Sequence, residues 1–410
     1  MDHQTQVRII KELFRQLDNN VNVDAGRQLR NPTSSYTCKD LAAREWESFF
    51  QSHPQLIGLS GDLPVPGSYL TIDDFGVPVL ATRDNEGRFR AFLNACRHRG
   101  VRVANESRGE SPRFKCPFHN WTYSNSGELL GIPRAKDFGE IDRSCHGLIE
   151  LPASERYGQL WVHPQPGGAL DVDDILGSLT EEIAAWDVGD LVFMGESTID
   201  KDLNWKLAND TFGETYHFSR LHKDTLGQLF IGDALDYEVF GRNHRFVFPS
   251  QAINRLREMP EEEWTIRPGA NVLYYLFPNI QFNVGARSVA VIRIYPDGTN
   301  PSRSITRISH YYSKAQIELL KDPQRTIIDG SNVYDTSSRD GKVAFSVEAN
   351  MEIFDSTVEQ EDYLMGELTQ KAAENGLLKH VIFGRNEPAL HHYHNTFRHV
   401  LNMPQLDVMG

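Results

Sequence analysis

Two short stretches, Cys96-Arg97-His98 and Cys116-Pro117-Phe118-His119, are the most informative part of this 410-residue chain. Seventeen residues separate them, so the sequence follows the pattern C-x-H-x17-C-x2-H. A structural zinc finger usually takes its cysteines from one short arm and its histidines from the other. Here each arm supplies one thiolate and one imidazole. This alternation argues against a zinc finger.

Two iron ions satisfy the alternation if both cysteines hold one iron and both histidines hold the other. That is the ligand set of a Rieske [2Fe–2S] centre. The predicted ligands are Cys96, His98, Cys116 and His119. The two remaining cysteines, Cys38 and Cys145, are too few for a disulfide framework, and we expect them to be buried thiols.

The sequence around these ligands predicts a small antiparallel β-domain. Short apolar segments at 78–82 and 89–93 flank the turn signal Asp84-Asn85-Glu86-Gly87. The domain is expected to end near residues 157–163. The stretch 164–168, which is rich in proline and glycine, then forms a linker.

The rest of the chain mixes predicted helices with predicted strands, which makes the protein α+β. Its length favours two to three domains. The predicted helices cover residues 7–17, 39–51, 205–222, 347–376 and 389–401, and the predicted strands cover 191–199 and, as a pair, 272–296.

Charge and hydropathy exclude several classes of protein. The formal net charge of −14 argues against binding to nucleic acid or to an anionic membrane surface. No run of 18 apolar residues exists, and the first residues resemble no signal peptide, so we expect a cytoplasmic protein. Residues 97–115 are locally basic, with six basic and two acidic side chains. This patch is either a solvated loop surface or a docking face for an acidic partner or subunit.

A second candidate metal site lies in the stretch Glu214-x-x-His217-x4-His222. On a regular α-helix, residues five apart point about 140° away from each other and do not share a metal easily. We therefore expect a π-bulge that brings His217 and His222 together, with Glu214 on the same face as His217. Two histidines and one carboxylate form a facial triad for non-haem Fe(II).

Composition alone does not choose the third ligand. Five carboxylates lie between residues 355 and 367, and such a run is also typical of a solvated helix face. They are Asp355, Glu359, Glu361, Asp362 and Glu367.

Over about residues 40 to 400 the chain resembles the catalytic α subunit of Rieske non-haem iron oxygenases, the aromatic-ring-hydroxylating dioxygenase family. The resemblance rests on the two Cys-His pairs, on Asn204-Trp205-Lys206 before the histidine motif, and on Glu361-Asp362. It implies that His217, His222 and Asp362 bind a mononuclear iron. It also implies a helix-grip (START-like) catalytic domain with a curved antiparallel sheet, and we place the domains at residues 1–44 (N-terminal helices), 45–165 (Rieske) and 166–410 (catalytic).

The resemblance further implies a homotrimer, with or without a β subunit, in which Glu214 links the iron site to a Rieske histidine of the next subunit. It favours His119 for that role. Three residues depart from the family pattern: Glu214 where many members have Asp, Asp210 where Asn is frequent, and Asn120 where a small residue is usual. The C-terminal histidines 391, 392 and 394 have no ligand role in the family.

A division of labour follows from these two sites. We expect the cluster to receive electrons from NAD(P)H through a reductase, with or without a ferredoxin, and the iron to use them with dioxygen to hydroxylate an aromatic or other apolar compound. Trp121 and Tyr123 are expected to shield or hydrogen-bond the cluster. Seven apolar residues line the substrate pocket or are simply core: Leu226, Phe230, Phe246, Phe248, Tyr275, Phe277 and Phe282.

Two other functions stay open from the sequence. One is monooxygenation or demethylation of a methylated or quaternary ammonium compound, because an aromatic cage binds such cations. The other is an electron-transfer or helix-grip binding protein that lacks the mononuclear iron.

Overall fold

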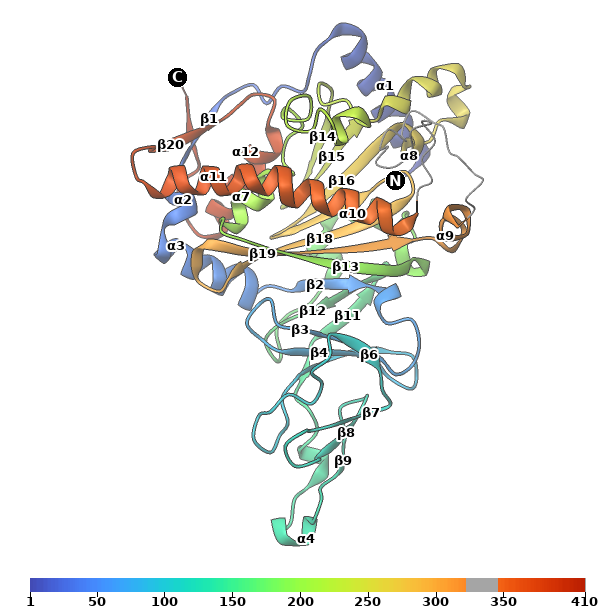
Figure 1. The fold of residues 1–410 in the computed structure, drawn as a ribbon, viewed down its shortest axis with the longest axis vertical. Helices are drawn as coiled ribbons and strands as arrows, with labels where there is room; N and C mark the ends of the chain where they lie inside the picture. The colour runs from blue at the N-terminus through green and yellow to red at the C-terminus, as the bar shows by residue number, and fades with distance from the viewer. Residues whose placement is uncertain (322–345, 410) are drawn as a thin grey trace. The chain divides into compact units, whose positions relative to one another are not determined.

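A computed structural model describes residues 1–321 and 346–409 (Figure 1). The chain forms two compact units. The larger unit comprises residues 1–44, 176–186 and 194–410, and the smaller unit comprises residues 45–175 and 187–193.

The smaller unit is built from antiparallel strands, as the sequence predicts. Asp84 and Gly87 close the predicted hairpin, because the Gly87 N–H donates to the Asp84 carbonyl and Gly87 has a φ of +79°. One sheet has the order β10-β5-β4-β3-β6, a second β11-β12-β2 and a third β7-β8-β9. The strands are β2 (Gln55–Leu59), β3 (Ser68–Ile72), β4 (Val79–Arg83), β5 (Phe89–Leu93), β6 (Arg108–Glu110), β7 (Arg113–Lys115), β8 (Thr122–Ser124), β9 (Leu129–Gly131), β10 (Glu150–Leu151), β11 (Ala153–Arg156) and β12 (Gln159–Val162).

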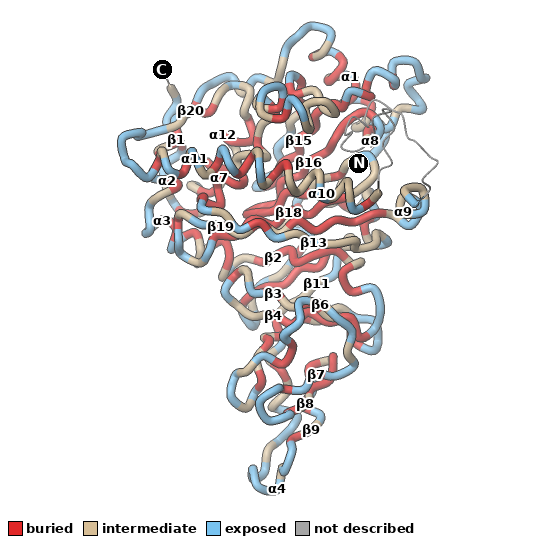
Figure 2. Tube along the Cα trace, viewed as in Figure 1, coloured by how far each residue is buried: buried red, intermediate tan, exposed pale blue. Residues whose placement is uncertain are grey.

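The larger unit contains a seven-stranded antiparallel sheet with the order β13-β19-β18-β17-β16-β15-β14. Its central strands are buried along almost their whole length, which appears as continuous red in Figure 2. Residues 272–296 belong to three strands, so the prediction of two was wrong. A strand buried on both faces shows no polar alternation, and the sequence signal for its ends is weak. The strands are β13 (Val192–Lys201), β14 (Asp236–Phe240), β15 (Asn243–Pro249), β16 (Ala270–Leu276), β17 (Ile280–Val284), β18 (Ser288–Asp297) and β19 (Asn300–Tyr312).

A long helical stretch runs across this sheet (Figure 1). It comprises α10 (Val347–Thr357), a π-helical turn (Val358–Asp362) and α11 (Tyr363–Glu374). The Ser346 side chain caps its start by accepting from the Ala349 N–H, 3.1 Å away. The Tyr363 hydroxyl lies 2.8 Å from the Thr306 hydroxyl on β19, which anchors α11 to the sheet. The predicted helix 347–376 is confirmed, with a π turn that the sequence did not predict.

The remaining elements are a small sheet and several helices. A small sheet has the order β20-β1-β21, with β1 (Leu29–Pro32), β20 (His380–Phe383) and β21 (Asp407–Val408). The other α-helices are α1 (His3–Asn19), α2 (Ser34–Thr37), α3 (Lys39–Glu45), α4 (Ala135–Phe138), α5 (Val172–Leu176), α6 (Thr180–Ala184), α7 (Trp205–Asp210), α8 (Ile266–Gly269), α9 (Lys314–Leu320) and α12 (Pro388–Val400). None of the described helices is both long and apolar enough to cross a membrane.

The helix predicted over residues 205–222 is wrong beyond its first third. Helix α7 ends at Asp210, and hydrogen-bonded turns follow. Residues 209–213, Asn-Asp-Thr-Phe-Gly, have low helix propensity. Gly213 is also required for close packing, since a Cβ there would lie 2.7 Å from side-chain atoms of Leu390 and Tyr393.

The prediction that Cys38 and Cys145 are buried thiols is wrong, because both are exposed.

Candidate metal centres

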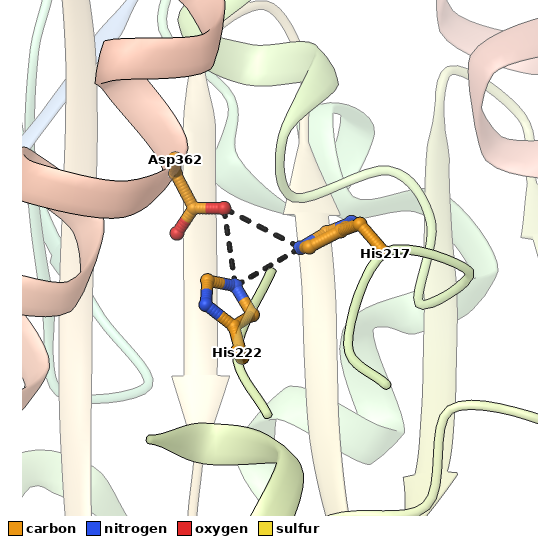
Figure 3. A group of neighbouring side chains, drawn as sticks. All are labelled: His217, His222 and Asp362. Carbon is orange, nitrogen blue, oxygen red and sulfur yellow. Dashed lines mark hydrogen bonds and ion pairs between the residues drawn. The ribbon is translucent and has the colours of Figure 1, made fainter. Parts of the chain in front are cut away.

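Three side chains of the larger unit converge on one point (Figure 3). The Nε2 atoms of His217 and His222 are 3.1 Å apart. An Oδ1 atom of Asp362 lies 3.3 Å from Nε2 of His217 and 3.2 Å from Nε2 of His222. His222 and Asp362 are buried.

These separations fit one metal ion. Ligand atoms about 2.1 Å from a metal, in mutually perpendicular directions, are about 3.0 Å from one another. The observed separations of 3.1, 3.2 and 3.3 Å match that arrangement closely. Three ligands on one face leave the opposite positions of an octahedral ion open.

Two further carboxylates contact the Nδ1 atoms of the histidines, on the side of each ring away from the shared point. Nδ1 of His217 pairs with Glu214, and the His217 backbone N–H also donates to Glu214, 3.2 Å away. Nδ1 of His222 lies 2.7 Å from Glu361, which also accepts from the Thr225 hydroxyl at 2.9 Å. A carboxylate at Nδ1 keeps the proton there and leaves Nε2 free for a metal.

The electrostatics of this group favour a cation. Burial lowers the pKa of His217, but Asp362 and Glu214 outweigh burial and raise it to about 10. Burial acts to raise the pKa of Asp362, yet the two histidines hold it below its usual value. Three carboxylates surround two imidazoles, so positive charge is stabilised at this point, whether protons or a metal ion carry it.

The local structure that positions these residues differs from the predicted one. His217 and His222 lie on consecutive turns, in which the Leu221 N–H donates to His217 and the Thr225 N–H to His222. The predicted π-bulge between the histidines is therefore wrong. A π turn occurs instead at the third member, because Asp362 ends the π-helical segment that begins at Val358.

A cavity of about 200 Å³ opens beside the three converging side chains. Of the seven residues proposed for the pocket, Leu226, Phe230, Phe246 and Phe248 line it, and Tyr275, Phe277 and Phe282 do not. The last three are buried in the core of the larger unit, which is the alternative that the sequence left open for them.

The smaller unit places Cys96 and Cys116 on two loops of the same design. In each loop the cysteine N–H donates to the carbonyl five residues later, and its carbonyl accepts from the N–H four residues later. That fourth residue is Gly100 in one loop and Asn120 in the other, with φ of +75° and +55°. The departure at Asn120 is thus tolerated because Asn adopts the left-handed conformation more readily than most residues.

The four predicted cluster ligands lie together at these loops. Cys96 and Cys116 are buried, and the rings of His98 and His119 lie 4.6 Å apart between centroids. Trp121 stacks on His98 at 5.3 Å, and the Tyr123 hydroxyl lies 3.3 Å from the Cys96 sulfur. Burial raises the pKa of the Cys116 thiol.

The basic patch of residues 97–115 is partly neutralised within the smaller unit. Arg102 pairs with Asp73 at 2.7 Å, and Arg108 pairs with Asp62 at 2.5 Å.

Two family models match the two regions of the chain. A family model described as the ring hydroxylating alpha subunit (catalytic domain) matches residues 188–402, just over half of the chain. The chain belongs to this ring-hydroxylating alpha-subunit family. A model of the Rieske [2Fe-2S] domain matches residues 53–148, so the sequence-based resemblance is confirmed.

Curated relatives of this alpha-subunit family match about half of the chain. The glycine betaine monooxygenase oxygenase subunit of Chromohalobacter salexigens is 31% identical over 208 residues, 50% of this chain and 46% of the relative. The large oxygenase component of a naphthalene 1,2-dioxygenase system from Ralstonia sp is 32% identical over 199 residues, 46% of this chain and 42% of the relative. The matched region therefore spans less than half the length of these relatives.

Solved structures of the family confirm the predicted α+β fold. The quaternary ammonium Rieske monooxygenase CntA in complex with L-carnitine has a TM-score of 0.70 at 17% identity, covering 90% of this chain and 95% of that chain. Naphthalene 1,2-dioxygenase from Rhodococcus sp. bound to indole has a TM-score of 0.69 at 18% identity, covering 96% and 97%. At such low identity the similarity concerns the fold.

Asp210, which departs from the alpha-subunit pattern, has a defined place in this chain. Its carboxylate accepts from the hydroxyls of Tyr36, at 2.7 Å, and Tyr393, at 2.9 Å. It also lies 2.8 Å from Nε2 of His394. Asp210 therefore ties α2 and α12 to the end of α7.

Sequence reasoning on this alpha subunit missed the position of Glu361. Glu361 was one of five carboxylates in an acidic run, and only Asp362 was assigned. A signal was available in principle, because each histidine at a metal site needs a partner for its second nitrogen.

Proposed function

We propose that this protein is the terminal oxygenase component of a multicomponent system, which uses NAD(P)H-derived electrons and dioxygen to hydroxylate an aromatic or other apolar organic compound. One observation carries the proposal: three ligand atoms of His217, His222 and Asp362 converge at the wall of a largely apolar cavity.

In this proposal His217, His222 and Asp362 hold Fe(II), whose chemistry is the activation of dioxygen at positions that the protein leaves open. Cys96, Cys116, His98 and His119 hold the [2Fe–2S] group, which supplies electrons one at a time.

The surrounding residues have distinct tasks. Glu214 and Glu361 hold the Nδ1 protons, so that both Nε2 lone pairs face the metal position. Phe218, Phe246 and Phe248 line the cavity, where they exclude water and orient an apolar substrate against the triad.

The proposal includes partners. A reductase, with or without a ferredoxin, delivers the electrons. The protein forms a head-to-tail homotrimer, with or without a β subunit, in which Glu214 faces His119 of the next subunit. Both Glu214 oxygens already contact His217, and each oxygen has a second lone pair for a further donor.

A second candidate reaction is the monooxygenation or demethylation of a methylated or quaternary ammonium compound. The phenylalanine rings along the cavity favour it, since aromatic faces attract such cations. The similarity to a glycine betaine monooxygenase subunit points in the same direction.

Iron and acid-labile sulfide analysis tests the proposal first. We expect three irons per chain in the loaded protein, two in the cluster and one at the triad. His222→Ala should contain two irons and should lose NADH-dependent oxygen uptake with a reductase. Glu359 lies in the same acidic run but pairs with Lys201. Glu359→Gln should therefore keep all three irons and the NADH-dependent oxygen uptake.

Only two irons in fully cluster-loaded wild-type protein would instead indicate an electron-transfer or helix-grip binding protein. Among oxygenase products, a cis-diol indicates dioxygenation of a ring and formaldehyde indicates demethylation.

A further inference from the structure

The wall of the cavity carries a positive charge. Arg267, on the short helix α8, lines the same cavity as His217, His222 and Asp362. Its Nε donates to the carbonyl of Gly285, 3.0 Å away. Within residues 1–321 and 346–409, its two terminal nitrogens have no hydrogen-bond acceptor and no carboxylate pairs with it.

This arrangement is costly for the protein alone. Arg267 is half-buried, and burial lowers its pKa with no opposing contribution from an acidic neighbour. A guanidinium nevertheless stays protonated, so a desolvated charge remains at the cavity wall. Buried charges are normally paired, and an anionic ligand would supply the missing partner.

A second group at the cavity wall has an unused hydrogen-bond donor. Asn271 and Asn283 both line the cavity, and the Asn271 amide donates to Oδ1 of Asn283 at 2.5 Å. With its oxygen occupied in this way, the amide nitrogen of Asn283 has no acceptor among the described residues. A carboxylate has two oxygens and accepts from a guanidinium fork and an amide together.

The cavity has room for an organic group in addition to a carboxylate. A dry cavity of about 150 Å³ holds benzene. A volume of about 200 Å³ therefore accommodates one ring or a trimethylammonium group together with a carboxylate.

We propose that Arg267 binds the carboxylate of the substrate, assisted by Asn283, so that the substrate is a small organic acid whose opposite end lies against His217, His222 and Asp362. The orientation rests on the proposed function, because it assumes that oxidation takes place at the triad. The oxidised end is an aromatic ring or a methylated ammonium group, and the test distinguishes the two.

Ligand binding to the iron-loaded protein, measured by calorimetry without a reductase, tests the inference. The probes are benzoate and glycine betaine. Each is compared with the corresponding amide, in which an uncharged carboxamide replaces the carboxylate. We expect the wild type to bind one of the two acids at least tenfold more tightly than its amide. Arg267→Met should weaken binding of that acid about ten- to a hundredfold and leave the amide unaffected, and Arg267→Lys should be intermediate because it loses the fork.

Arg30→Met, at an exposed position of β1, is the matched control and should bind like the wild type. Equal affinity of acid and amide for the wild type would overturn the inference, even if Arg267→Met failed to fold. Acid binding that depends on Arg267, with no product in the reconstituted system, would instead contradict the proposed function. Turnover of neutral substrates with no preference for acids would contradict this inference alone.

Discussion

His222 is contacted on both ring nitrogens by two consecutive residues of one helix. Glu361 reaches Nδ1 and Asp362 reaches Nε2. Composition could not separate these two carboxylates from the three others nearby. The five carboxylates differ in the burial and the direction of their side chains, because a metal ligand must be shielded from water and point at the metal. Both properties arise only when this helix packs against the turns that carry His217 and His222.

A different buried histidine predicts how stability depends on pH. His244 stacks on Tyr275, with ring centroids 4.9 Å apart, and its Nδ1 lies 3.0 Å from Nδ1 of His392. His392 Nε2 faces the Gly241 carbonyl at 2.9 Å, so His244 donates the shared proton. Burial, and secondarily His392, holds the pKa of His244 well below its usual value.

The fold therefore favours neutral His244, whereas the unfolded chain takes up a proton near pH 6.5. The resulting stabilisation is present above that pH and is lost as the pH falls, by up to about 1.4 kcal/mol per pH unit. His244→Phe keeps the stacking and cannot be protonated. We expect its melting temperature to drop less than that of the wild type between pH 7 and pH 5.

His380→Gln, at an exposed position, is the control for this measurement and should follow the wild type. Parallel melting temperatures of wild type and His244→Phe across this pH range would contradict the assignment.

At the scale of elements, periodicity predicts which segments are helical and fails where backbone geometry is special. Helix α1 and the long helical stretch of residues 347–374 follow from apolar spacing. The turns after Asp210 and the π turn at Val358–Asp362 do not, because packing against other elements determines them. We predicted a π-bulge between His217 and His222. A π-helical backbone does occur at the proposed metal site, but it positions Asp362 and not the histidines.

The π turn gives a test of its own. The Tyr363 N–H donates to the Val358 carbonyl, so this turn contains one residue more than an α-helical turn. Deleting the exposed Gln360 restores the α-helical pattern and rotates the residues of the turn by about 100°. We expect iron to fall from three to two per chain while far-ultraviolet circular dichroism stays unchanged.

Gln360→Ala keeps the length of the turn and should retain all three irons. If the deletion variant also retained three irons, the extra residue would have no part in placing Glu361 and Asp362.

At the scale of the molecule, residue spacing predicts two chemically different sites, and only the family resemblance implies how they cooperate. Local spacing is enough for the Cys-His loops, because all four ligands come from two loops of one small unit. The triad joins residues 217, 222 and 362, which only the complete larger unit brings together. The proposed trimer depends on contacts between chains, which neither local spacing nor the fold of one chain determines.

Complementation between two inactive variants tests whether the cluster of one chain serves the iron of the next. Cys96→Ser removes the cluster and His222→Ala removes the mononuclear iron, so each variant alone should lack coupled turnover. Co-expression mixes the two variants at random in each trimer. A chain with an intact cluster then lies next to a chain with an intact triad, in the productive order, at about one quarter of the interfaces. We expect about that fraction of wild-type activity. No recovery would indicate transfer within each chain.

The same mixture isolates Glu214. Glu214→Gln added to the Cys96→Ser chain alters the triad that receives electrons, so the recovered activity should be lost while mononuclear iron is retained. Added to the His222→Ala chain, it alters a triad that is already inactive, and the recovered activity should persist. Equal effects in both chains would contradict any role of Glu214 at the triad that receives electrons, and retained mononuclear iron separates a failure of electron transfer from a failure of His217 to hold the metal.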